Sequence, residues 1–375
     1  MSDQSEEDPT EVEDDPSRSR DIELACENCG AQVTWDPEAD ALSCAHCGHE
    51  KTVPRGEGTI EERPLSAAGD AARGLGVEVR VAQCETCGAR VAFDKKSTAT
   101  ECVFCGSPSV LAQEANRNAL RPESLIPLDV GREEVERRFR KWIKGLWFRP
   151  NALKKTKDFR AVGVYIPAWT FDCAVHSDWS ADAGYYYWVT ESYTTRVNGK
   201  TVRRTRQVRK IRWRPAWGER DDAYDDLQIL ASHGVAPGLA AELGPFDTAE
   251  LVPYKPEYLA GWRAEEYQVD LETGWGMGKH AVAESQRARC AGDIPGDTHR
   301  RLEVRNRVRD VRWKHVLLPM WSLTYQYGGK GYAVLIHGQS GRIAGKAPLS
   351  WFKILGLVLL IVALVLIVLA VGAAS

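Results

Sequence analysis

The hydrophobic positions between residues 131 and 150 follow a helical period. Within "GREEVERRFRKWIKGLWFRP", large apolar residues recur every three or four positions and basic residues fill the gaps. The pattern predicts an amphipathic, basic helix, which either packs on the body with a solvated face or lies on a membrane surface. Its apolar stripe consists of Val135, Phe139, Trp142, Ile143, Leu146 and Trp147.

Residues 161–217 and 301–345 instead alternate between apolar and polar positions, as β-strands do. The phrases "GYYYWVTESYTT" and "TVRRTRQVRKIRWR" flank "VNGK", which predicts a hairpin with Asn198-Gly199 as its tight turn. Part of the stretch between the two strand regions has a helical pattern. Together these segments predict an α+β domain over residues 122–348 with a mostly antiparallel sheet.

The C-terminal stretch from Ile354 to Val371 contains no charged or polar side chain. Eighteen such residues match about one bilayer hydrocarbon thickness of helix, so a transmembrane helix is predicted over 351–373. The positive-inside bias then predicts a single-pass protein of the cytoplasmic membrane with its N-terminal body in the cytoplasm. The basic residues that precede the stretch are Arg342, Lys346 and Lys353.

The N-terminus is acidic and polar. Residues 1–20 hold eight acidic residues against Arg18 and Arg20, which predicts a disordered acidic tail over 1–22. A secretory signal needs a basic start followed by an apolar stretch, and this start has neither. The N-terminal body is therefore expected to stay in the cytoplasm.

Eight of the ten cysteines form four C-x-x-C pairs, grouped in two units of identical spacing. "CENCGAQVTWDPEADALSCAHCG" and "CETCGARVAFDKKSTATECVFCG" repeat with an offset of 58 residues, which indicates a duplicated module. Two such turns can surround one ion, so each unit predicts a tetrahedral, four-thiolate Zn²⁺ site. The predicted ligands are Cys26, Cys29, Cys44 and Cys47 in the first unit and Cys84, Cys87, Cys102 and Cys105 in the second.

The spacing predicts zinc ribbons at residues 23–50 and 81–110, joined by a linker over 51–80. Redox C-x-x-C chemistry does not call for paired motifs, and a disulfide framework conflicts with a cytoplasmic location. Four thiolates leave no open coordination position, so both metals are expected to be structural, each supplying on the order of 10 kcal/mol of folding energy. Cys173 and Cys290 stand alone and are expected to be buried small hydrophobes.

A third candidate site is the strand at 202–214, which carries seven basic residues close to aromatic ones. Basic charge interleaved with aromatics is typical of nucleic-acid binding, and anionic lipid is an alternative ligand. A third interpretation is a solvated face neutralised by "ERDDAYDD" at 219–226. The basic residues are Arg203, Arg204, Arg206, Arg209, Lys210, Arg212 and Arg214.

The sequence contains none of the catalytic motifs that would indicate an enzyme. "GWGMGKH" at 274–280 lacks the spacing of a phosphate-binding loop, and neither G-x-S-x-G nor H-E-x-x-H occurs. A non-enzymatic protein is therefore expected.

Each cysteine unit looks like a zinc ribbon of the transcription-factor-B type. Longer phrases add to this likeness: "WFRPNALKK", "GVYIPAWTFD", "GYYYWVTESY", "LVPYKPEYLAGWRAEEYQVDLETGW" and "KHVLLPMWSLTYQYGGKGYAVLIHGQSGRIAGKAP". By these phrases and its apolar end, the chain resembles a family of bacterial membrane-anchored zinc-ribbon proteins. Relatives are often labelled primosomal protein N-prime or superfamily II helicase, although no Walker motif occurs here. Some are encoded beside phage-shock-protein-A-like and SPFH-type partners, so the resemblance implies such protein partners and a role in envelope maintenance or stress.

These observations lead to two functional hypotheses. The first is a non-enzymatic, membrane-tethered adaptor whose two ribbons recruit a cytoplasmic protein, with duplication raising avidity. The second is a membrane-associated nucleic-acid-binding protein that uses the basic strand.

Overall fold

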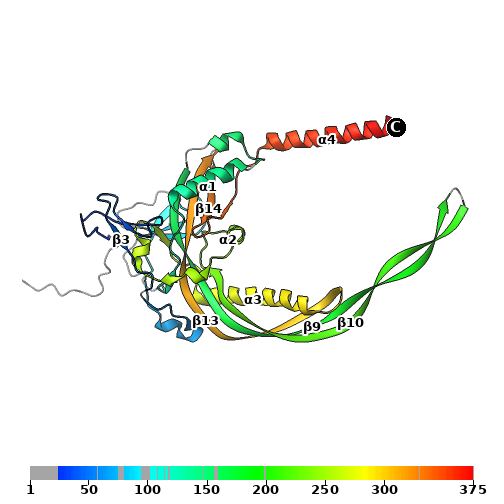
Figure 1. Ribbon diagram of the computed structural model, residues 1–375, viewed down its shortest axis with the longest axis horizontal. Coiled ribbons are helices and arrows are strands. Elements are labelled where there is room, and N and C mark those ends of the chain that lie inside the picture. Colours follow the sequence, from blue (N-terminus) through cyan, green and yellow to red (C-terminus); the bar gives the residue numbers. More distant parts are fainter. Residues whose placement is uncertain are drawn as a thin grey trace, which may run out of the picture.

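The computed structural model describes residues 24–374 apart from 57, 75–79, 94–101, 108, 114, 117–118, 146, 156–158, 198–199 and 329. The predicted acidic tail and the Asn198-Gly199 turn lie outside the described residues. Figure 1 shows a central body from which two long extensions project on the same side: the helix α4 (Trp351–Ala374) and a two-stranded arm.

A 12-stranded sheet forms the centre of the body. Its long strands β9 (Phe159–Val197) and β13 (Thr298–Tyr327) pair antiparallel, and β10 (Lys200–Leu230) pairs antiparallel with β9. The sheet is nevertheless mixed, because the short β8 (Ser124–Leu125) joins β13 in parallel and β12 (Arg263–Glu265) joins β9 in parallel. The other strands in this sheet are β4 (Arg63–Pro64), β5 (Arg80–Cys84), β6 (Arg90–Phe93), β7 (Val110–Gln113), β11 (Val252–Pro253), β14 (Lys330–His337) and β15 (Ile343–Gly345).

The inner half of β9 is buried on both faces, which explains its nearly continuous apolar sequence. Val164 and Ile166 pack into one cluster of core side chains, and Tyr165 packs into another on the opposite face. Further along the strand, Trp169 and Phe171 join a third cluster. A strand with two buried faces needs apolar residues at successive positions rather than at alternate ones.

The residues that the structure describes form four α-helices. α1 (Arg132–Gly145) buries Val135, Phe139 and Ile143, so the amphipathic helix predicted from the sequence forms and packs on the body. α3 (Leu271–Asp293) is capped by Asp270, whose carboxylate accepts a hydrogen bond from the Thr273 N–H at 2.8 Å. The remaining helical elements are α2 (Pro237–Leu243) and the 3₁₀ segments η1 (Leu65–Asp70), η2 (Asn151–Lys155), η3 (Thr248–Glu250) and η4 (Pro256–Leu259).

The first cysteine unit forms a separate three-stranded sheet of β1 (Thr34–Asp36), β2 (Ala41–Ser43) and β3 (Glu50–Thr52). We call residues 24–54 ribbon 1. Its Trp35 is buried against Tyr258 of the body, with ring centroids 4.7 Å apart. Trp262 adds a hydrogen bond from its indole N–H to the Trp35 carbonyl, at 3.1 Å. Ribbon 1 therefore shares its core with the body.

The second cysteine unit, which we call ribbon 2 (described residues of 80–113), is part of the central sheet itself. Its strand β6 pairs antiparallel with β12, and Arg90 forms an ion pair with the nearly buried Glu266 at 3.0 Å. The stretch between the ribbons also contacts the body, because β4 pairs with β13 and the Trp313 indole N–H donates to the Pro64 carbonyl.

The structure contradicts the membrane span predicted for the C-terminal stretch. Within the residues that the structure describes, no helix combines the length and the apolar character that crossing a membrane requires. The predictions of a transmembrane helix over 351–373, of membrane anchoring and of a single-pass membrane location are therefore wrong.

The arm is the outer part of the β9–β10 hairpin. The third strand, β13, pairs with β9 only as far as the Thr298–Gly184 pair, whereas β9 and β10 continue as a two-stranded ribbon to the Val197–Lys200 pair. We call the described residues of 184–218 the arm. Most of its side chains are exposed.

Candidate functional site

The eight predicted metal ligands gather in two groups of four. Within each group the sulfur atoms all lie within 4.8 Å of one another. A tetrahedron with metal–sulfur bonds of about 2.3 Å has edges of about 3.8 Å, and the closest sulfur pairs come near that value. These pairs are Cys26–Cys47 at 3.5 Å and Cys29–Cys44, Cys84–Cys105 and Cys87–Cys102 at 3.6 Å.

The backbone around each group is shaped to point N–H groups at sulfur. Gly30, Gly48, Gly88 and Gly106 follow the second cysteine of each pair, and all four adopt positive φ between 70° and 80°. In ribbon 2 the Phe104 N–H donates to Cys102 Sγ at 3.4 Å. In ribbon 1 the His49 N–H, assisted by Asn28, lowers the pKa of the Cys47 thiol to about 6. Such donors stabilise the thiolate form that a metal ion binds, so the residues fit a four-thiolate metal site.

The two groups differ in exposure. Cys29 and Cys47 of ribbon 1 are exposed, whereas Cys87 and Cys105 at the equivalent positions of ribbon 2 are half-buried. The difference follows from the fold, because ribbon 2 is built into the central sheet and ribbon 1 is attached by one side. Cys173 and Cys290, which lie outside both groups, are buried in the core as the sequence predicts.

The third strand of each ribbon has a different neighbour in the two copies. In ribbon 2, β7 pairs with β5, with Cys84 opposite Val110, and the Glu85 N–H donates to the Ser109 carbonyl at 3.0 Å. The equivalent pair in ribbon 1, 58 residues earlier, would be Cys26 opposite Thr52. In ribbon 1 that pairing is absent among the described residues, because β3 pairs with β2 instead.

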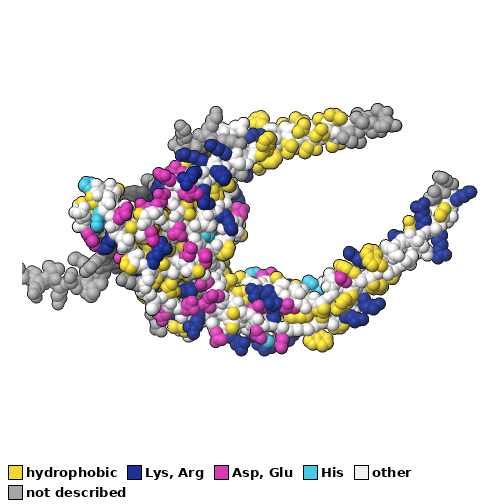
Figure 2. Space-filling view, viewed as in Figure 1, with side chains coloured by type: hydrophobic (Ala, Val, Ile, Leu, Met, Phe, Trp, Pro, Cys, Tyr) yellow, Lys and Arg dark blue, Asp and Glu magenta, His cyan; other side chains and the backbone are white. Residues whose placement is uncertain are grey.

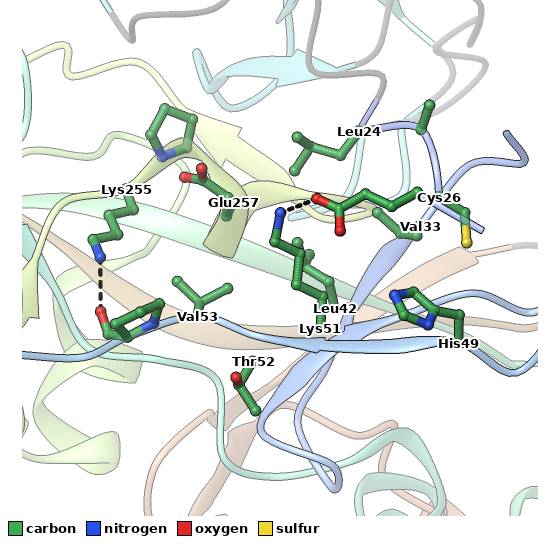
Figure 3. Close-up of a pocket in the computed structure, with 14 residues that line it drawn as sticks. Leu24, Cys26, Val33, Leu42, His49, Lys51, Thr52, Val53, Lys255 and Glu257 are labelled. Atoms are coloured by element: carbon green, nitrogen blue, oxygen red, sulfur yellow. Dashed lines mark hydrogen bonds and ion pairs between the residues drawn. The ribbon is translucent and has the colours of Figure 1, made fainter.

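A pocket of about 480 Å³ lies where the ribbon 2 pairing would be in ribbon 1. Its walls are the stretch 24–27, the end of β3 with the residues after it, and residues 255–257 of the body (Figure 3). Two polar contacts join its walls. Lys51 forms an ion pair with Glu27, and Lys255 Nζ donates a hydrogen bond to the Pro54 carbonyl at 2.8 Å. The apolar side chains lining the pocket are Leu24, Val33, Leu42 and Val53.

The seven basic residues predicted as a candidate site all lie on β10 within the arm, and Figure 2 shows Lys and Arg side chains along it. The acidic segment 219–226 does not lie opposite them. Register places Arg203–Arg214 against Thr194–Ala183, whereas Glu219 faces Asp178 nearer the body. There Asp222 binds Arg220 and Arg289, which lowers its pKa far below the ordinary range. The interpretation that "ERDDAYDD" neutralises the basic strand is therefore not supported by the strand register.

Arginine side chains lie over aromatic rings of the arm. Arg209 lies over Tyr186 at 4.2 Å from the ring centroid, and Arg300 of β13 lies over Trp213 at the same distance. Three further contacts of this kind, Arg206–Tyr193, Arg212–Tyr187 and Arg214–Tyr185, have distances between 5.4 and 5.8 Å. Such cation–π pairs hold long arginine side chains in defined directions.

Two features of the site were not apparent from the sequence. The pocket depends on which strand pairs with the third strand of the ribbon, and a strand pairing is not visible in the local sequence. The buried contact between Trp35 and Tyr258 joins residues far apart in the chain. The signal for the pocket was the divergence of the two copies at 50–52 ("EKT") and 108–110 ("PSV"). The signal for the contact was the pair of aromatic residues in "PEYLAGW".

Comparisons with known proteins give one similar sequence. The chain is 28% identical over 341 residues to uncharacterized protein YdjG of Bacillus subtilis (strain 168), covering 89% of this chain and 92% of that protein. No protein-family model matches the chain. No solved structure matches it either.

Proposed function

We propose that the chain is a non-enzymatic recruitment protein with two structural zinc sites of the transcription-factor-B ribbon type, and that ribbon 1 binds an extended segment of a partner protein. The observation that supports this proposal is the pocket beside β3. In ribbon 2 the equivalent strands, β5 and β7, pair directly with each other and leave no such space. Ribbon 1 therefore offers a strand edge and an apolar recess together, which are the two elements of peptide recognition by strand addition.

The register of β3 shows which backbone groups face outward. The Cys44 N–H donates to the His49 carbonyl, so these two residues form a hydrogen-bonded pair. In an antiparallel pairing such pairs alternate, which makes Leu42–Lys51 the next hydrogen-bonded pair and leaves the Thr52 N–H and carbonyl pointing away from β2. Thr52 lines the pocket, so its backbone can pair with an added strand.

The lining of the pocket indicates what that strand would carry. Leu24, Val33, Leu42 and Val53 form an apolar recess, and the charged residues around it are of both signs. An aliphatic side chain of the partner would fill the recess, gaining roughly 1.5–3 kcal/mol from burial. The zinc ion would hold the two knuckles of the ribbon and so keep both walls of the pocket in place.

The proposal is tested by removing the outward N–H without changing the side-chain volume greatly. Thr52→Pro deletes that donor, and Thr52→Val is the matched control that keeps it. The tagged full chain and both variants would be used to capture partners from nuclease-treated extracts, and the same captured protein would be quantified by mass spectrometry. A photoreactive residue at position 53 would identify which segment of that protein lies in the pocket.

Recruitment at ribbon 1 predicts that the captured protein is lost with Thr52→Pro, retained with Thr52→Val and cross-linked from position 53. Metal content and thermal midpoint should be the same for all three proteins, which shows that the ribbon remains folded. If the captured protein is bound equally by both variants, or cross-links only from another surface, strand addition at ribbon 1 is wrong.

A further inference from the structure

The arm has two faces, and cross-strand pairing assigns each side chain to one of them. Residues directly opposite each other in an antiparallel pair point to the same side of the ribbon. Arg204 faces Tyr193, Lys210 faces Tyr187, and Arg212 faces Tyr185. We call this side the basic face; it carries Lys200, Arg204, Arg206, Lys210, Arg212 and Arg214 with Tyr185, Tyr187, Tyr193 and Glu191.

The charge of the basic face is mostly unneutralised. Its one acid, Glu191, forms ion pairs with Arg206 at 3.5 Å and with Lys210 at 2.9 Å. The ion pairs among the described residues do not include Arg204, Arg212 or Arg214. Six cations against one acid on a single exposed face favour a ligand with closely spaced negative charges.

The tyrosines of the basic face provide a second kind of contact. Tyr185, Tyr187 and Tyr193 are between 36% and 40% exposed, which is high for such large rings. Same-face neighbours along a strand are about 6.7 Å apart. Each of the three rings has an arginine over it, so stacking surface and positive charge repeat together along the face.

We infer that the basic face of the arm binds single-stranded nucleic acid, with phosphates held by the arginines and lysines and bases stacked on the tyrosines. Proteins that bind single strands combine these two elements, a basic track for the backbone and aromatic rings for unpaired bases. A duplex offers the same phosphates but no free base faces, so the exposed tyrosines distinguish the two ligands. This inference is independent of recruitment at ribbon 1, because the arm and the pocket share no residue.

The binding can be measured with the full, metal-loaded chain and a fluorescently labelled 20-nucleotide oligothymidine, by anisotropy at several salt concentrations. Three to five phosphate contacts predict a plot of log affinity against log salt with a slope of about −2 to −3.5. A duplex of the same length should bind more weakly, because it cannot stack on the tyrosines.

Two pairs of variants separate this site from a general charge effect. Arg212→Gln with Arg214→Gln removes two charges from the basic face, and Arg203→Gln with Arg209→Gln removes two from the opposite face of the same arm. The first double variant should lose affinity at least tenfold and flatten the salt slope by about 1.4, whereas the second should lose less than threefold. Tyr187→Ala should weaken binding about 5- to 150-fold, and Tyr187→Phe should bind like the unchanged chain.

The inference is overturned by any of four results: no binding at 50 mM salt, equal losses from the two double variants, tighter binding of the duplex, or no effect of Tyr187→Ala. Heparin provides a further comparison, since a merely polyanionic site would bind it with the same dependence on Arg212 and no dependence on Tyr187. If the binding of both heparin and oligothymidine depends on Arg212 and not on Tyr187, base stacking is refuted.

Discussion

A buried lysine links the stretch between the ribbons to the central sheet, and its replacement gives a sharp test of how the body is held together. Lys314 on β13 is only 6% exposed at its side chain, and its Nζ lies 2.8 Å from Glu62 and 2.7 Å from Asp226. Asp172 belongs to the same group of carboxylates, and its burial raises its pKa to about 6. Lys314→Met keeps the length of the side chain but removes the cation.

Lys314→Met is expected to lower the free energy of unfolding by a large amount at high pH and by a smaller amount at acidic pH. Removing one partner of a buried ion pair costs about 3–5 kcal/mol, because the charges left behind have no compensation. Without the lysine, the raised pKa of Asp172 rises further and Glu62 loses the contact that contributes most to lowering its pKa, so the variant regains stability as these carboxylates take up protons on acidification. Each pKa unit corresponds to about 1.4 kcal/mol, and the destabilisation should therefore fall by about 1–2 kcal/mol between pH 8 and pH 5.

The assay is urea unfolding of the unchanged chain and the variant at pH 8, 6.5 and 5, with the free energy of unfolding compared at each pH. A double variant that also carries Asp226→Asn should recover part of the loss at pH 8, because one uncompensated charge is removed. A cost below about 1 kcal/mol at pH 8, or one that grows toward pH 5, would refute the assignment of Lys314 as the compensating charge.

Three further predictions follow from metal binding, burial and packing. The purified chain should contain two zinc ions, and Cys105→Ser should release one and lower the thermal midpoint, as atomic absorption and calorimetry would show. Burial lowers the pKa of His315 to about 4, so the unfolded chain binds the extra proton and stability falls between pH 6.5 and 4; His315→Phe should flatten this loss in thermal unfolding at pH 7 and 5. Gly163→Ala would place a methyl group 2.3 Å from the Trp262 ring and should cost about 1–3 kcal/mol, whereas Gly145→Ala meets no atom within 4 Å and should be nearly neutral in urea unfolding.

Local patterns in the sequence predicted much of the local structure. The helical stripe of Val135, Phe139 and Ile143 is the buried side of α1, and the hairpin strands on either side of residues 198–199 are paired as the alternation indicates. The eight cysteines come together as their spacing predicts. Each of these features depends on residues that are close in the chain, so period and spacing are sufficient to predict them.

Features that depend on distant partners could not be predicted in this way. The parallel pairing of β8 with β13 and of β12 with β9 makes the sheet mixed. Neither β8 nor β12 is long enough to show an alternation of apolar and polar residues. The acidic segment 219–226 follows the basic strand directly, yet register places it against another part of β9. For the C-terminal stretch, hydropathy alone predicted a membrane span, whereas no helix among the described residues combines the length and the apolar character that a span requires.

The two faces of the arm limit how its length can change during evolution. Because side chains alternate along each strand, deleting one residue from a strand would exchange the faces of everything beyond it, and would move Arg204 and its neighbours to the side of Trp188. Removing two residues from each strand would shorten the arm by about 7 Å and leave the faces as they are. Homologous chains with shorter or longer arms are therefore expected to differ by even numbers of residues in each strand.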